Sequence, residues 1–136
     1  MQSGFRLGLI INPIAGVGGQ AALKGSDGVV EQALAQGVLP QAQRRVAIAL
    51  EQLLPLRDQL QLFAAPGAMG SDLLTELGFE HQVVGELSDP NQTNPEDTER
   101  CAAALQKTGI DLLLFAGGDG TARNICNQIS GSQLVL

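Results

Sequence analysis

The sequence has few of the residues on which several common functions depend. It contains no Trp and no Tyr, and only four Phe. The core must therefore be aliphatic, and few side chains could stack on bases, which argues against binding of single-stranded nucleic acid. Basic residues are also scarce, because eight Lys and Arg stand against fourteen Asp and Glu, for a net charge of −6. This balance disfavours binding along a phosphate backbone, so no nucleic-acid partner is expected.

Histidine and cysteine are equally scarce. His81 is the only histidine, which excludes a metal site built from several histidines. Cys101 and Cys126 form no Cys-x-x-Cys pair, so we interpret them as free thiols of a cytoplasmic protein, with Cys126 in the core. The sequence has no recognisable signal peptide and no apolar run near the ~18 residues of a membrane helix. No membrane partner is expected either.

What is present indicates one domain of the α/β class. The chain has 136 residues, 44% of them hydrophobic, and apolar runs of strand length alternate with segments of helical pattern. The predicted strands are 5–11, 60–65, 81–84, 111–115 and 133–136. The predicted helices are 29–35, 40–54, 69–77, 95–108 and 121–129. Alternating strands and helices predict a parallel sheet.

Two of these helices carry specific expectations. The helix over 40–54 should bury its apolar residues and end before Pro55. Those apolar residues are Val46, Ile48, Leu50, Leu53 and Leu54. The helix over 95–108 should begin at an Asn94 cap, with Asp97 near the capping-box position, and stop at Gly109. Asp97 and Thr98 could instead face a ligand cleft, but helix capping is the favoured interpretation of Asp97.

Glycine-rich segments follow two of the predicted strands, where ligands bind in parallel α/β sheets. The first follows Asn12 and extends from Gly16 to Gly28. From Gly16 it fits G-x-G-x-x-A, one form of the dinucleotide fingerprint, although a plain crossover loop fits as well. Lys24, Ser26 and Asp27 are either ligand contacts or solvated loop residues. They form no Walker A motif, because no glycine precedes the lysine.

The second glycine-rich segment, Gly117–Thr121, lies directly between a buried strand and a helix. Glycines allow close approach of the backbone to an anion and positive φ angles, and a helix start offers unpaired amides. Thr121 adds a hydroxyl donor. Asp119 could orient a substrate hydroxyl, hold Mg²⁺ or simply cap the helix. Arg123 could reach a phosphate or lie on a solvated helix face.

These residues carry a family resemblance. Residues 117–121 resemble the GGDGT signature of the NAD kinase and diacylglycerol kinase superfamily, and residues 8–16 resemble its opening NP-x-AG segment. The fuller pattern is most similar to prokaryotic ATP- or polyphosphate-dependent NAD kinase-like proteins. The resemblance implies that residues 1–136 are a Rossmann-like three-layer N-terminal domain that binds nucleotides and phosphate, without the family's β-rich C-terminal domain. Because the chain ends inside an apolar strand, we expect it to be cut from a longer protein. The alternative is that this is the last strand of the sheet.

The resemblance also implies a reaction, in which a phosphoryl group passes from ATP or polyphosphate, with Mg²⁺, to the 2′-hydroxyl of NAD. Asp119 would be catalytic. The predicted phosphate-lining residues are Gly117, Gly118, Gly120 and Thr121, with Asn12 and Gly16 lining the neighbouring loop. The partners would be nucleotide substrates and further copies of the chain in a homo-oligomer. Two alternatives stay open: a kinase for another hydroxyl, such as that of a lipid, and a non-catalytic nucleotide-binding regulatory module.

Overall fold

The structure is a computed structural model that describes residues 4–13, 41–89, 94–129 and 131–136. Its centre is a sheet of four parallel strands in the order β3-β2-β1-β4. The strands are β1 (Phe5–Ile11), β2 (Leu60–Ala64), β3 (Gln82–Val83) and β4 (Leu112–Ala116). The α-helices are α3 (Gln41–Glu51), α4 (Ser71–Leu77), α5 (Pro95–Lys107) and α6 (Asp119–Cys126), and the 3-10 helices are η1 (Leu54–Gln59) and η2 (Gly67–Met69). The predicted α/β class with a parallel sheet is confirmed.

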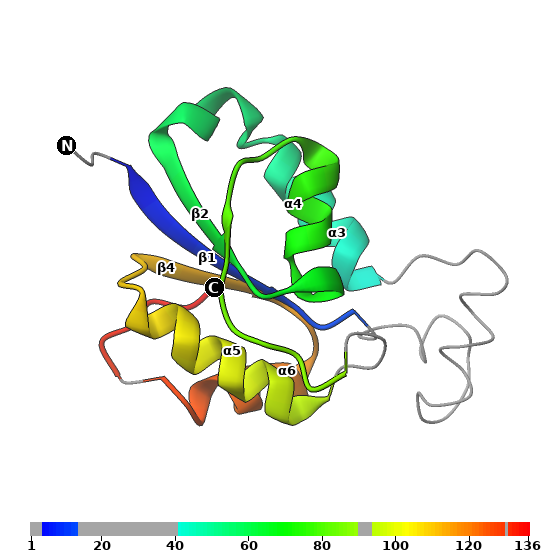
Figure 1. Cartoon of the computed structure of the whole chain (residues 1–136), viewed down its shortest axis with the longest axis vertical. Coiled ribbons are helices and arrows are strands. Elements are labelled where there is room, and N and C mark those ends of the chain that lie inside the picture. Colours follow the sequence, from blue (N-terminus) through cyan, green and yellow to red (C-terminus); the bar gives the residue numbers. More distant parts are fainter. Residues whose placement is uncertain (1–3, 14–40, 90–93, 130) are drawn as a thin grey trace, which may run out of the picture.

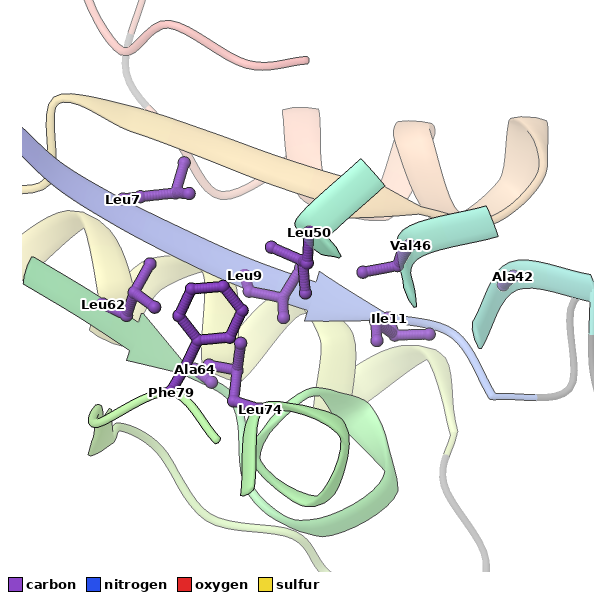
Figure 2. Close-up of a cluster of buried hydrophobic side chains, with 10 residues drawn as sticks. All are labelled: Leu7, Leu9, Ile11, Ala42, Val46, Leu50, Leu62, Ala64, Leu74 and Phe79. Carbon is purple, nitrogen blue, oxygen red and sulfur yellow. The ribbon is translucent and has the colours of Figure 1, made fainter. Parts of the chain in front are cut away.

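Helices cover both faces of the sheet, α3 and α4 on one side and α5 and α6 on the other (Figure 1). The central strand β1 is buried from Leu7 to Ile11 because each of its faces meets a helical layer. Its residues Leu7, Leu9 and Ile11 join α3 and α4 in one core cluster, shown in Figure 2. That cluster comprises Leu7, Leu9, Ile11, Ala42, Val46, Leu50, Leu62, Ala64, Leu74 and Phe79.

The second core cluster lies under α5 and α6. It comprises Ile10, Phe63, Ala65, Met69, Cys101, Ala102, Leu105, Ile110, Leu113 and Ile125. The packing of this cluster requires glycine at position 8, because a Cβ there would lie 2.7 Å from Cδ1 of Ile110. The glycine inside the strand thus makes room for the residue that leads into β4.

Helix α3 corrects two expectations for the segment 40–54. Its buried residues are Ala42, Val46 and Leu50, one every four residues, whereas Ile48 is 64% exposed. Ile48 lies between Val46 and Leu50 in the sequence but two residues from each, which on a helix puts it on the opposite face. The α-helix ends before Pro55 as expected, but it ends at Glu51, three residues earlier than predicted, and Pro55 lies inside η1.

Other boundaries differ by small amounts. The predicted helix over 69–77 divides at Gly70, which lies between η2 and α4, and Gly78 ends α4 in the left-handed conformation. Helix α6 begins two residues earlier than predicted. The predicted strand 133–136 pairs in parallel with β4 through a single bridge, Leu113 to Val135. The predicted helix over 29–35 lies outside the described residues.

The two thiols are placed differently from the expectation. Cys126, expected in the core, is exposed, and Cys101 of α5 is the buried one. Burial raises the pKa of the Cys101 thiol to about 11, so this thiol is protonated at neutral pH. Among the helices of the described ranges, none combines the length and the apolar character that crossing a bilayer needs.

Arg6 lies near the amino end of β1, at the edge of the sheet opposite the carboxyl strand ends that the glycine motifs follow. Its guanidinium donates to the carbonyl oxygens of Thr108 (2.6 Å) and Gly109 (2.9 Å), just beyond the end of α5, and to Oε1 of Gln61 (2.8 Å). It also lies 4.7 Å from the centre of the Phe63 ring. One side chain on β1 therefore satisfies carbonyls at the end of a helix and connects them to β2.

Replacing Arg6 should weaken this edge. We expect Arg6→Met to lower the free energy of unfolding by about 1–3 kcal/mol, because it removes three hydrogen bonds from a charged donor and keeps only the apolar stem. The matched control is Arg57→Met, at an exposed site on η1, where a change within about 0.5 kcal/mol is expected. Urea unfolding of both variants measures the difference, and equal stabilities would contradict this role of Arg6.

Candidate functional site

The carboxyl ends of β1 and β4 lie side by side at one edge of the sheet. Ile11 is aligned with Ala116, and the amide of Asn12 donates to the Ala116 carbonyl at 2.8 Å. The strand order reverses here, since β2 and β3 follow on the far side of β1 from β4. Helices α3 and α6 pack on opposite faces (Figure 1). Ligands of open parallel sheets bind in the crevice at such a switch point.

The turn Gly117–Thr121 connects β4 to α6 at this edge. Gly118 is the N-cap residue and α6 begins at Asp119, so the interpretation of Asp119 as an ordinary N-cap is wrong. The amide of Ala122 donates to the Gly118 carbonyl at 3.1 Å, which closes the first turn of the helix. The amides of residues 119–121 precede that bond, and first-turn amides have no partner within their own helix. Asp119 and Gly120 are both exposed.

The three glycines of this turn differ in what they do. None of them has a positive φ, so the turn does not use the access of glycine to the left-handed region. At Gly117 a Cβ would lie 2.4 Å from Oγ1 of Thr121, so the Thr121 side chain excludes any larger residue. At Gly118 and Gly120 a Cβ would meet no atom of the described residues within 4 Å. Packing within the described chain therefore explains Gly117 but not the other two.

Asn12 and Thr121 join the two glycine motifs. Nδ2 of Asn12 donates to Oγ1 of Thr121 at 3.0 Å, across 109 residues of sequence. Thr121 is only 4% exposed, so its hydroxyl is part of the interior of the turn, and its predicted phosphate contact stays a prediction. Arg123 is exposed on α6. Of the first motif, Gly16 and the weaker candidates Lys24, Ser26 and Asp27 lie outside the described residues.

The structure adds a third turn to this edge that the sequence did not single out. The segment Pro66–Gly70 follows β2, the strand next to β1, and two of its glycines have positive φ, Gly67 (57°) and Gly70 (156°). A Cβ on Gly70 would lie 3.3 Å from the Leu9 carbonyl oxygen, so this turn packs directly on β1. The closely spaced glycines at a strand end were a usable signal, but the apolar residues around them favoured a helix.

Asp97 forms hydrogen bonds at the start of α5, which confirms its role as a capping residue. The Asp97 amide donates to Oδ1 of Asn94 at 2.8 Å, and the Asn94 amide donates back to the Asp97 carboxylate at 3.1 Å. The buried carboxylate also accepts from the amide and hydroxyl of Ser88 and pairs with Arg100. Burial alone would raise the pKa of Asp97, but the hydrogen bonds from Ser88 and Asn94 and the charge of Arg100 together lower it.

Comparison with known protein families agrees with this geometry. The family model described as the ATP-NAD kinase N-terminal domain matches residues 7–134, which include both glycine motifs. The chain belongs to the ATP-NAD kinase N-terminal domain family. No curated protein and no solved structure matches the chain significantly. Membership in this kinase family supports a kinase-like function in general and a Rossmann-like α/β domain, as expected from the resemblance.

The two kinds of glycine give a prediction for the stability of this ATP-NAD kinase N-terminal domain. Gly117→Ala should lower the free energy of unfolding by about 1–3 kcal/mol, because the new Cβ collides with Thr121. Gly120→Ala is the matched control in the same turn. It should leave stability unchanged or raise it by up to about 1 kcal/mol, since alanine favours the helix and meets no atom. Thermal or urea unfolding measures both, and equal losses would contradict the packing assigned to Gly117.

A further prediction concerns pH. Because the pKa of Asp97 is lowered by folding, its ionisation adds stability above its usual value of 3.8, and that contribution is lost as the pH falls below this value. Asp97→Asn should cost about 1–3 kcal/mol at pH 7. The difference between wild type and variant should shrink between pH 5 and pH 3. Urea unfolding across this range measures it, and a constant difference would contradict the account.

Proposed function

We propose that this domain holds the phosphates of its substrates at the carboxyl edge of β1 and β4, in an NAD kinase-like phosphotransferase. The reaction transfers a phosphoryl group from ATP or polyphosphate to the 2′-hydroxyl of NAD and forms NADP. The observation that carries the proposal is the convergence of Asn12 and the Gly117–Thr121 turn at the switch point of the sheet. Membership in the ATP-NAD kinase N-terminal domain family supports it.

The chemistry of the turn suits phosphate better than a neutral ligand. The first-turn amides of α6 carry partial positive charge at the end of a helix dipole, which favours an anion. No atom of the described residues lies within 4 Å of a Cβ built on Gly118 or Gly120, which leaves phosphate oxygens room to approach those amides. Arg123 lies four residues after Asp119 and so on the same side of α6, where its charge would assist. A backbone site of this kind needs no basic surface, in agreement with the net charge of −6.

Asp119 is the catalytic residue in this proposal. Its exposed carboxylate orients the 2′-hydroxyl toward the phosphorus atom and accepts the hydroxyl proton as the new O–P bond forms. The bond between the transferred phosphorus and the donor's bridging oxygen breaks, and the rest of the donor leaves. Because the transition state of phosphoryl transfer is loose, orientation by Asp119 matters more than basic strength.

Magnesium fits this site as an ion held mainly by the donor. Within the described ranges, no group of three or more His, Cys, Asp or Glu side chains could hold a metal. Mg²⁺ commonly uses one or two carboxylates, several waters and substrate phosphates, so Asp119 would supply a single ligand. When bound, the ion neutralises charge on the phosphates.

The test is the rate at which the protein, in the full form that its natural cell makes, forms NADP from NAD. Asp119→Asn should lower kcat by about 100-fold or more, since the amide cannot accept the proton. The free energy of unfolding of this variant should stay near that of the wild type. The matched control is Asp72→Asn, an exposed acid in the first turn of α4, which should keep full activity.

The same assay decides among the alternatives. Full activity of Asp119→Asn would remove this residue from the mechanism. If the wild type phosphorylates a lipid or another hydroxyl compound and leaves NAD unmodified, that compound and not NAD is the acceptor. Tight nucleotide binding without transfer from any donor would favour a regulatory module over an enzyme.

A further inference from the structure

The start of α6 lacks the local restraint that the start of α5 has. At α5, the side chains of Asn94 and Asp97 form a reciprocal capping box, and the Asp97 amide is occupied by Asn94. At α6 the N-cap residue is Gly118, and no side chain of the described residues caps the helix. A capping side chain would take one of the first-turn amides. The uncapped start of α6 keeps these amides available but leaves the turn without its usual anchor.

A residue of β1 supplies an anchor from outside the helix. Asn12 holds the turn at both ends, since its backbone amide donates to Ala116 at 2.8 Å and its side-chain amide donates to Oγ1 of Thr121 at 3.0 Å. Neither bond uses a first-turn amide of α6. The second bond ends on a buried hydroxyl, which is shielded from competing water.

Thr121 transmits this restraint to the backbone of the turn. Its side chain fills the space above Gly117, where Cβ, Oγ1 and Cγ2 would all lie within 2.8 Å of an added Cβ. Thr is also branched at Cβ, so few rotamers are open to it. A Thr121 side chain fixed by Asn12 on one side and packed on Gly117 on the other sets the position of Asp119 and Gly120 between them.

We propose that Asn12 is a positioning residue, which acts through Thr121 to hold the uncapped first turn of α6 in the geometry that phosphoryl transfer requires. This inference rests on the proposed function. Holding reacting groups in place contributes a large part of catalysis, and small displacements of supporting residues have large effects on rate. Loss of the Asn12–Thr121 bond should therefore lower kcat more than it raises KM.

A double-mutant cycle tests the proposal on the protein as its own cell produces it. Asn12→Ala removes the donor, and Thr121→Val removes the acceptor while it keeps the branched shape. Each should lower kcat for NADP formation about tenfold, and the double variant should be no slower than the slower single variant, because both remove the same bond. Thr121→Ser keeps a hydroxyl and should recover most of the rate. Thr75→Val, at an exposed position of α4, is the matched control and should be as active as the wild type.

Additive losses in the double variant would overturn the proposal, because Asn12 would then act independently of Thr121. A larger effect on KM than on kcat would also overturn it. The affinity for tripolyphosphate, measured by calorimetry on the same proteins, distinguishes failure of the positioning role of Asn12 from failure of the proposed reaction. A wild type that binds tripolyphosphate without forming NADP removes the proposed reaction, and coupling in the binding cycle then still supports positioning by Asn12. A wild type that neither binds tripolyphosphate nor forms NADP overturns both.

Discussion

The parallel pairing of β1 with β4 is the constraint on which the rest of the site depends. It puts Ile11 opposite Ala116, so that two segments separated by about a hundred residues leave the sheet at one edge. Burial of β1 on both faces fixes this register, since a shift by one residue would exchange Leu9 and Ile10 between the two core clusters. The Asn12–Thr121 bond and the position of α6 both follow from this pairing.

The two helix starts at this edge differ in how their first turns are held. The start of α5 is closed by a buried carboxylate with a full set of partners, and it contributes to folding. The start of α6 is glycine-rich, exposed and uncapped, which sacrifices local stability and keeps backbone donors available. The cost is offset by Thr121, which is packed on Gly117 and bonded to Asn12.

Much of the fold could be predicted because it depends on local patterns. The limits of β1 and the capping residues Asn94 and Asp97 follow from neighbouring residues, and the structure confirms them. The exposure of Ile48 was missed because composition alone does not set the helical phase. At the site, the motif Gly117–Thr121 was identified, but its internal geometry was not. The contact between Asn12 and Thr121 links distant segments, and no pattern along the chain encodes it.

The proposal that phosphate binds at the carboxyl ends of β1 and β4 is tested most directly by locating the bound phosphate. Amide chemical shifts of the isotope-labelled protein, recorded during titration with tripolyphosphate, report this residue by residue. The largest changes should fall on the turn 117–121 and on Asn12, and amides near Arg6 and Gly109 at the opposite edge should stay unchanged. Saturable changes concentrated elsewhere, with the turn unaffected, would contradict it.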